Sequence, residues 1–205
     1  MNHEYQLEID MKNSVTNVIL VGVGGQGIIL ASEVLAEVAL LAGRDVRKSE
    51  VHGMAQRGGS VSSHVRFGDE VKSPLIELGN ANYMLAFEKV EGLRSCDFLA
   101  GGATIIMNDE EIIPPLVSLG MGSYPDSVQD RLSDFGFNLE LVPAHSLAEQ
   151  AGTFKAANIV LLASLASHLD IERDLWVEVI KRRVPKKFID VNMEAFRLGY
   201  EASAE

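Results

Sequence analysis

Apolar residues in this chain fall into short runs whose spacing alternates between that of strands and that of helices. The first run, Asn17–Val21, has the length of a buried strand, and the apolar segment that starts at Ile28 has the length of a helix. Further strands are predicted at Asp45–Lys48, Ser60–Phe67, Asn82–Phe87, Thr104–Met107 and Leu139–Val142. Further helices are predicted at Lys89–Leu99, Ser146–Gln150, Asn158–His168, Leu175–Arg182 and Ile189–Tyr200. This alternation predicts an α/β fold, a three-layer sandwich in which a mixed, mostly parallel sheet is covered on both faces.

One of these runs has a strict two-residue alternation, which is typical of a strand in an antiparallel hairpin. It places four side chains on one face: Val61, Ser63, Val65 and Phe67. Turn residues follow at Gly68 and Asp69, and a shorter strand is expected around Val71. We therefore expect an antiparallel hairpin to be inserted in the otherwise parallel sheet.

Local signals set further expectations for individual residues. Gly101 and Gly102 are expected to stop the helix that starts at Lys89, and Asn158 is expected to be the N-cap of its helix. Glu33 and Glu37, one helical turn apart, fit a polar helix face better than an acid–base pair. The two basic clusters of the chain, Arg44–Lys48 and Lys181–Lys187, are interpreted as solvated faces.

The turn between the first strand and the first helix is rich in glycine and gives the first indication of a binding site. Gly22, Gly24 and Gly27 fit the spacing G-x-G-x-x-G, and Gly25 and Gln26 lie between them. A helix that begins at such a turn directs its unpaired N–H groups and the positive end of its dipole towards the space above it, which favours a phosphate or a carboxylate. The alternative is that the glycines only permit a close strand-to-helix crossing.

A second unusual stretch, Ser49–Gly59, follows neither helical nor strand periodicity. It contains His52, Gln56, Arg57 and Gly58, a composition more typical of a functional loop than of a connector. The guanidinium of Arg57 offers five donors beside approachable glycine backbone, which suits an anionic ligand. An ion pair within the chain or between subunits is the alternative for Arg57. Because ligands of such sheets bind at the carboxyl ends of the strands, we expect this loop to meet the glycine turn there.

The composition and charge of the chain indicate its domain organisation, the partners it is expected to lack and the compartment in which it works. The 205 residues are 47% hydrophobic, so we expect one α/β domain over residues 17–200, preceded by a flexible tail over residues 1–16. The net charge of −11 argues against a nucleic-acid or anionic-membrane surface, and no apolar run reaches the roughly 18 residues of a membrane span. The lone Cys96 suits the reducing cytoplasm, where we expect the protein to work.

The same residue counts limit the chemistry that this chain can perform by itself. An iron–sulfur cluster normally needs four thiolates, which one cysteine cannot supply. The five histidines share no metal-like spacing, and no catalytic nucleophile motif is present, so we predict neither a metal site nor a catalytic residue. A nicotinamide or flavin dinucleotide would need an acid near the end of the second strand, for which Asp45 and Glu50 are the candidates.

Two motifs carry a resemblance to a known family. G-V-G-G-Q-G-I at Gly22–Ile28 and S-E-V-H-G-M-A-Q-R-G-G-S-V at Ser49–Val61 resemble the gamma component of 2-oxoacid:ferredoxin oxidoreductases. The resemblance runs from Asn17 to Arg197, almost the whole chain. The residues before Arg57 are closest in style to the arylpyruvate, or indolepyruvate, branch of that family.

The resemblance implies a cytoplasmic accessory subunit of an oxidoreductase that works with partner chains. The implied reaction is the oxidative decarboxylation of a 2-oxoacid with coenzyme A and oxidised ferredoxin. It gives acyl-CoA, carbon dioxide and reduced ferredoxin, and the electrons reach ferredoxin through the complex. Thiamine diphosphate, magnesium and 4Fe–4S clusters are expected on the partner subunits, and a homodimer is one state expected of the isolated chain.

The resemblance also implies a contact with coenzyme A at the two motifs. The residues carried over are Gly24, Gly25, Gln26, Gly27, Arg57, Gly58 and Gly59, and the neighbouring Gly22, His52 and Gln56 complete the candidate cofactor-binding set. Two other functions stay open on the residues alone. One is a self-contained dinucleotide-dependent oxidoreductase, and the other is a purely structural assembly subunit.

Overall fold

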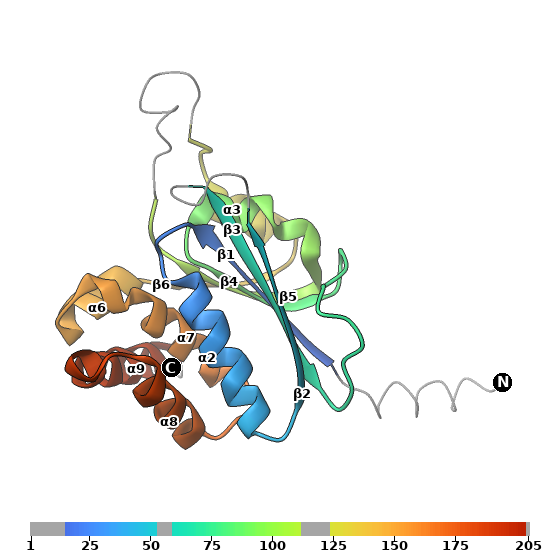
Figure 1. Ribbon diagram of the computed structural model, residues 1–205. Helices are drawn as coiled ribbons and strands as arrows, with labels where there is room; N and C mark the ends of the chain where they lie inside the picture. The colour runs from blue at the N-terminus through green and yellow to red at the C-terminus, as the bar shows by residue number, and fades with distance from the viewer. Residues whose placement is uncertain (1–14, 53–58, 112–123, 204–205) are drawn as a thin grey trace.

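The strands of this protein form one mixed sheet, seen in a computed structural model that describes residues 15–52, 59–111 and 124–203 (Figure 1). Within these residues, six strands are arranged in the order β2-β3-β1-β4-β5-β6. The strands are β1 (Val15–Val23), β2 (Asp45–His52), β3 (Ser60–Gly68), β4 (Ala81–Ala86), β5 (Leu99–Asn108) and β6 (Asn138–Val142). β3 runs antiparallel to both of its neighbours, whereas the pairs β1–β4, β4–β5 and β5–β6 are parallel. The predicted mixed, mostly parallel sheet is confirmed.

Helices cover both faces of this sheet, as a three-layer sandwich requires (Figure 1). One face is covered by α2 (Ile28–Leu41), α6 (Ala144–Ala151), α7 (Ala157–Ser167), α8 (Arg173–Arg183) and α9 (Ile189–Ser203). The other face is covered by α3 (Lys89–Arg94) and α5 (Val128–Asp134). The described residues also form three short 3₁₀ turns, η1 (Cys96–Phe98), η2 (Phe154–Ala156) and η3 (Lys186–Phe188). Among the described residues, no helix is both long and apolar enough to cross a bilayer.

The two apolar cores explain why these segments fold as they do. β1 buries alternate residues on opposite faces, with Val18 and Leu20 packed against α2 and α7, and Ile19 and Val21 packed towards α3. α7 is buried along nearly its whole length, which agrees with its continuous apolar run. The first helix begins at Ile28 as predicted, and Gly43, with φ +79°, ends the turn after it.

The antiparallel part of the sheet differs from the predicted hairpin. Val71 is not in a strand, and its N–H instead donates a hydrogen bond of 2.8 Å to the Asp45 carboxylate. β3 pairs with β2 and β1. The hairpin partner of β3 is therefore the strand before the loop, because β2 extends to His52 instead of ending at Lys48.

Two local predictions were wrong because tertiary context overrode the local signal. The helix from Lys89 ends at Arg94, and Gly101 and Gly102 lie inside β5, where the register with β4 shifts. Gly102, with φ +75°, permits this irregularity in the strand and does not terminate a helix. Asn158 lies inside α7, whose N-cap is Ala156.

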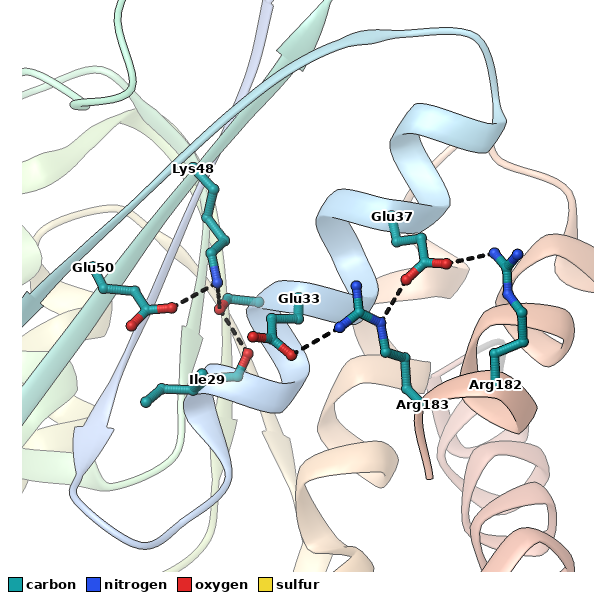
Figure 2. A network of polar contacts seen from close by, with 8 residues as sticks. Ile29, Glu33, Glu37, Lys48, Glu50, Arg182 and Arg183 are labelled. Carbon is teal, nitrogen blue, oxygen red and sulfur yellow. Dashed lines mark hydrogen bonds and ion pairs between the residues drawn. The ribbon is translucent and has the colours of Figure 1, made fainter. Parts of the chain in front are cut away.

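Ion pairs join α2 to α8, and one hydrogen bond joins it to Lys48 of β2 on the other side (Figure 2). Glu37 lies 2.5 Å from both Arg182 and Arg183 of α8, and Arg183 also reaches Glu33 at 3.2 Å. Towards the sheet, Lys48 of β2 lies 3.4 Å from the Ser32 hydroxyl and 2.6 Å from the Glu50 carboxylate. Glu33 and Glu37 thus form a polar helix face as predicted.

The basic residues of α8 were expected to be solvated, but two of them lie across from α2. Arg182 and Arg183 pair with carboxylates about 145 residues earlier in the chain. These pairs join the middle of α2 to the end of α8.

Candidate functional site

The glycine turn leads β1 into α2 through backbone conformations that only glycine adopts easily. Gly25 has φ +108° and Gly27 has φ +82°, and Gly25 is exposed. Gly27 is the N-cap of α2, so it supplies no side-chain hydrogen bond to the first turn of the helix. The first helical hydrogen bond runs from the Ala31 N–H to the Gly27 carbonyl at 3.0 Å. The start of α2 therefore offers backbone N–H groups without a side-chain cap, which is the geometry of an anion cradle.

Gln26 holds this turn in shape from the inside. Its Oε1 accepts a hydrogen bond of 2.7 Å from the Val23 N–H, and its Nε2 donates one of 2.9 Å to the Phe87 carbonyl. Gly22 lies beneath, where an added Cβ would be 2.6 Å from Gln26 Oε1 and 2.7 Å from Phe87 Cβ. Gly22 is thus required for packing, and both polar ends of the Gln26 amide are engaged within the protein.

The glycine turn meets the end of the predicted loop at Gly59, as the sequence predicts, although the first residues of that stretch, Ser49–His52, belong to β2. The Gly24 N–H donates a hydrogen bond of 3.0 Å to the Gly59 carbonyl. Gln56, Arg57 and Gly58 lie outside the described residues, and so does the side chain of His52. Their predicted part in ligand binding stays a prediction.

The glycine turn forms one wall of a cleft of about 380 Å³ at the carboxyl edge of the sheet. We call Gly25, Gln26 and Gly27 the turn wall. The opposite side, which we call the helix wall, consists of His145, Phe154, Lys155, Ala157 and Asn158. Phe87, Asn108, Glu110 and Leu161 complete the lining. This is the place where a sheet of this type binds its ligands.

The two walls are joined where the starts of α2 and α7 meet. The buried Asn158 donates from Nδ2 to the Gly27 carbonyl at 3.4 Å, and a Cβ added to Gly27 would lie 2.6 Å from the same nitrogen. The N-cap residue of α7, Ala156, makes no side-chain hydrogen bond, but the Ile159 N–H donates to Asn158 Oδ1 at 3.0 Å and the Ala157 N–H donates to the Phe154 carbonyl. The positive ends of two helix dipoles converge on one cleft, which favours an anionic group more than either helix would alone.

Glu110, an acidic side chain of the cleft lining, is hydrogen-bonded within the protein. Glu110 accepts a hydrogen bond of 2.8 Å from Asn108 Nδ2 and lies 3.1 Å from His145 Nδ1. Lys155 is exposed and has no acidic partner among the residues that the structure describes. Lys155 is therefore available to pair with a ligand anion.

A second polar cluster beside the cleft is satisfied internally. Burial opposes the charge of Lys89, but hydrogen bonds to Asp109 and Glu111 raise the pKa of its ammonium. Burial, together with a hydrogen bond of 2.5 Å to the buried Glu88, raises the pKa of Tyr124 far above its usual range. These groups bind one another, so we do not assign them to a ligand.

The remaining candidates from the sequence have structural roles. Burial raises the pKa of the Cys96 thiol, as expected for an inert cysteine. His64, one of the five histidines, is buried and accepts a hydrogen bond of 3.0 Å from the Ile76 N–H. Within the described residues, no group of three potential ligands is placed to hold a metal ion.

One of the two acids considered for a dinucleotide, Asp45, is misplaced, and the other, Glu50, binds Lys48 within β2. Asp45 pairs in register with Gly68, which faces Val15 at the start of β1, so Asp45 lies at the end of the sheet opposite the glycine turn. β3 also separates β2 from β1, whereas a dinucleotide-binding fold places its first two strands side by side. The geometry argues against the dinucleotide-dependent alternative.

Sequence reasoning missed most of the helix wall as a binding surface. From the sequence alone, His145 shares no metal-like spacing with the other histidines and Asn158 is expected to be a helix cap. No motif marks Phe154 or Lys155 as a ligand contact. The available signal was their position, because the helix wall follows β6 in the chain and Asn108 ends the parallel strand β5.

Comparisons with known proteins agree on one family and one fold. The family described as "Pyruvate ferredoxin/flavodoxin oxidoreductase" matches residues 17–202. The chain is 41% identical over 194 residues to the indolepyruvate oxidoreductase subunit IorB of Thermococcus kodakarensis, covering 92% of this chain and 96% of that one.

Two solved structures share the fold. The gamma subunit of a keto/oxoacid ferredoxin oxidoreductase from Geobacter sulfurreducens matches with a TM-score of 0.69 at 22% identity, over 92% of this chain and 98% of that chain. A 2-oxoglutarate:ferredoxin oxidoreductase from Magnetococcus marinus, solved with 2-oxoglutarate, coenzyme A and succinyl-CoA bound, matches with a TM-score of 0.72 at 21% identity. That match covers 92% of this chain and 31% of the other. At these identities the likeness concerns the fold alone.

Proposed function

Since this chain belongs to the pyruvate ferredoxin/flavodoxin oxidoreductase family, we propose that its cleft binds coenzyme A for a reaction completed by partner subunits. The chain is a gamma-type subunit of a 2-oxoacid:ferredoxin oxidoreductase and works in a multi-subunit complex. The identity to an indolepyruvate oxidoreductase subunit and the style of the residues before Arg57 favour an arylpyruvate as the 2-oxoacid.

The observation that carries this proposal is the uncapped start of α2, which opens onto the cleft beside the N-terminus of α7. Coenzyme A contains a diphosphate, and the starts of α2 and α7 favour such a group. Lys155 adds a cation without an acidic partner in the described part of the chain. Arg57, in the loop that ends beside Gly24, is proposed as a second cation for the same anion.

The reactive groups of the enzyme are assigned to the partner subunits. With Cys96 as its one cysteine, the chain cannot supply the four thiolates of a 4Fe–4S cluster. Thiamine diphosphate with its magnesium, and the clusters that reduce ferredoxin, are accordingly proposed to lie on the partners. This chain contributes binding and orientation of coenzyme A.

The test is the coenzyme A dependence of the enzyme reconstituted with its co-purifying subunits. We expect Lys155→Ala to raise the KM for coenzyme A about tenfold, because a charge-assisted hydrogen bond contributes about 1.5–3 kcal/mol. The KM for the 2-oxoacid should not change. Lys186→Ala, which removes an exposed lysine from η3 outside the cleft, is the matched control.

The purely structural alternative predicts a different result. If Lys155→Ala and Arg57→Ala both leave the KM for coenzyme A and the rate unchanged, the subunit does not contact coenzyme A through this cleft. The chain would then serve assembly of the complex alone.

A further inference from the structure

The helices α8 and α9 lie side by side in the helical layer, and an open groove of about 440 Å³ lies between them (Figure 1). This groove shares no lining residue with the cleft at the glycine turn. Its apolar lining consists of Val177, Met193 and Phe196. Arg173 and Lys181, both exposed and both on α8, line it as well. An apolar groove with cations along its side is suited to an amphipathic segment that also carries acidic residues.

The two cations on α8 are available for such a segment. Arg173 lies over the ring of Tyr200 at 4.9 Å and over that of Phe196 at 6.0 Å, contacts that leave the N–H groups of its guanidinium able to donate. Neither Arg173 nor Lys181 has an acidic partner within the part of the chain that the structure describes. Arg182 of the same helix, by contrast, is paired with a carboxylate of α2.

The acidic side chains of the groove have other roles. Glu194 is paired with Arg197 of its own helix at 2.6 Å. Asp190 lies in the first turn of α9, where the helix dipole favours a negative charge. With three cations and two carboxylates in its lining, the groove is positive although the chain as a whole has a net charge of −11.

The sequence that precedes β1 has the composition that this groove would accept. In residues 4–11, apolar and polar residues alternate strictly, so an extended conformation would place the two kinds on opposite faces. The apolar residues are Tyr5, Leu7, Ile9 and Met11, and the acidic residues are Glu4, Glu8 and Asp10.

This sequence joins the described structure close to the start of α8. Thr16 of β1 lines a small pocket together with residues 169–171, and α8 begins at Arg173. Glu8 precedes Thr16 by eight residues, which span about 26 Å when extended. The chain is therefore long enough for Glu8 to reach Arg173.

The spacing of the charges also matches. Arg173 and Lys181 are eight residues apart on one helix, or about 12 Å along its axis. Glu8 and Glu4 are four residues apart, or about 14 Å in an extended chain. The difference is within the reach of long side chains, so both cations can be paired at the same time.

We propose that residues 4–11 of this chain dock in the groove between α8 and α9, in place of the flexible tail expected from the sequence. Their apolar side chains cover the apolar lining of the groove, Glu8 pairs with Arg173, and Glu4 pairs with Lys181. The docked segment shields this groove from water and leaves the cleft at the glycine turn open to its ligand.

The experiment measures how fast chymotrypsin cleaves the full chain after Tyr5 and Leu7. When docking is fast, the rate of cleavage reports the fraction of molecules in which the segment is undocked. We expect Lys181→Glu to raise this rate about fivefold, because it replaces an attraction with a repulsion of similar size. Glu4→Lys should do the same, and the variant with both substitutions should return to nearly the original rate.

A control variant excludes an effect of net charge alone. Lys72→Glu changes the net charge by the same amount at an exposed lysine in the loop after β3, and it should leave the cleavage rate unchanged. A zero-length carbodiimide, which joins an amine to a carboxylate in direct contact, should link Lys181 to Glu4 within one chain. Lys72 should form no link to residues 4–11.

Three results would overturn the proposal. The first is a cleavage rate that Lys181→Glu leaves unchanged, or raises no more than Lys72→Glu does. The second is protection that appears only at high protein concentration, together with links between two chains, because the groove would then hold a segment of a second copy. The third is a link from Lys181 to a co-purifying subunit in the complex with none to Glu4 or Glu8, because the groove would then belong to a partner subunit.

Discussion

The turn wall and the helix wall face the same cleft but present different chemical groups to it. The turn wall presents backbone, and its one long side chain, Gln26, is fully engaged inside the protein by Val23 and Phe87. The helix wall presents side chains, among them the exposed Phe154 and Lys155. Substitutions on the turn wall should therefore change the stability of the fold, whereas substitutions at the exposed positions of the helix wall should change ligand affinity at almost constant stability.

The largest effect is expected where the two walls touch. Gly27→Ala places a Cβ 2.6 Å from Asn158 Nδ2 at a backbone φ of +82°, so it adds steric crowding to left-handed strain. We expect it to lower the free energy of unfolding by about 2–4 kcal/mol, measured by urea denaturation.

A second glycine with a similar φ separates the cost of steric crowding from the cost of backbone strain. Gly43 has φ +79° but open space around its Cβ position, so Gly43→Ala should cost about 1–2 kcal/mol from backbone strain alone. Equal losses for the two variants would mean that the contact between Gly27 and Asn158 contributes nothing.

A smaller loss in the free energy of unfolding is expected when the hydrogen bonds of Gln26 inside the turn wall are removed. Gln26→Ala leaves the Val23 N–H without its partner and the Phe87 carbonyl with only the longer bond of 3.4 Å from Asn108 Nδ2, and it should cost about 2 kcal/mol. Lys155→Ala, on the opposite wall, should change the melting temperature by less than about 1 °C, since it removes an exposed side chain without an acidic partner in the described residues. A reversed order of stability losses would contradict the division between the walls.

A smaller loss than that of Gln26→Ala is expected from the ion pairs that join α2 to α8. Arg183→Ala removes contacts to Glu33 and Glu37 and should cost about 0.5 kcal/mol at low salt and less at high salt, because the pairs are partly exposed. Arg197→Ala is the control, since Arg197 pairs with Glu194 and Glu201 on its own helix. A loss above about 2 kcal/mol that persists at high salt would mean that packing beneath the pairs, and not their charge, joins α2 to α8.

The contrast between the walls also explains what could be predicted from the sequence. The turn wall is local, because the spacing of Gly22, Gly24 and Gly27 and the start of a helix at Ile28 lie within seven consecutive residues. The order of apolar strands and helices likewise gave the three-layer architecture. Both follow from patterns that short-range steric and hydrophobic effects impose.

The helix wall could not be predicted in the same way because it depends on tertiary packing. Asparagine is a residue type favoured at the N-cap, but η2 directly precedes α7 and so Asn158 lies inside the helix. There its side chain donates to the carbonyl of Gly27, 131 residues earlier in the chain. The pairing of Arg182 with Glu37 depends on the same kind of long-range approach. In each case the residue type indicates a polar contact, but the partner is set by the fold because it lies far away in the sequence.

One structure determination would test the central claim most directly: that of the chain with its co-purifying subunits and coenzyme A. The account predicts phosphate oxygens within about 3 Å of backbone nitrogens at the start of α2, with Lys155 beside them and the sulfur directed towards a partner subunit. Coenzyme A bound to the complex without any atom in the cleft between Gly27 and Asn158 would contradict it.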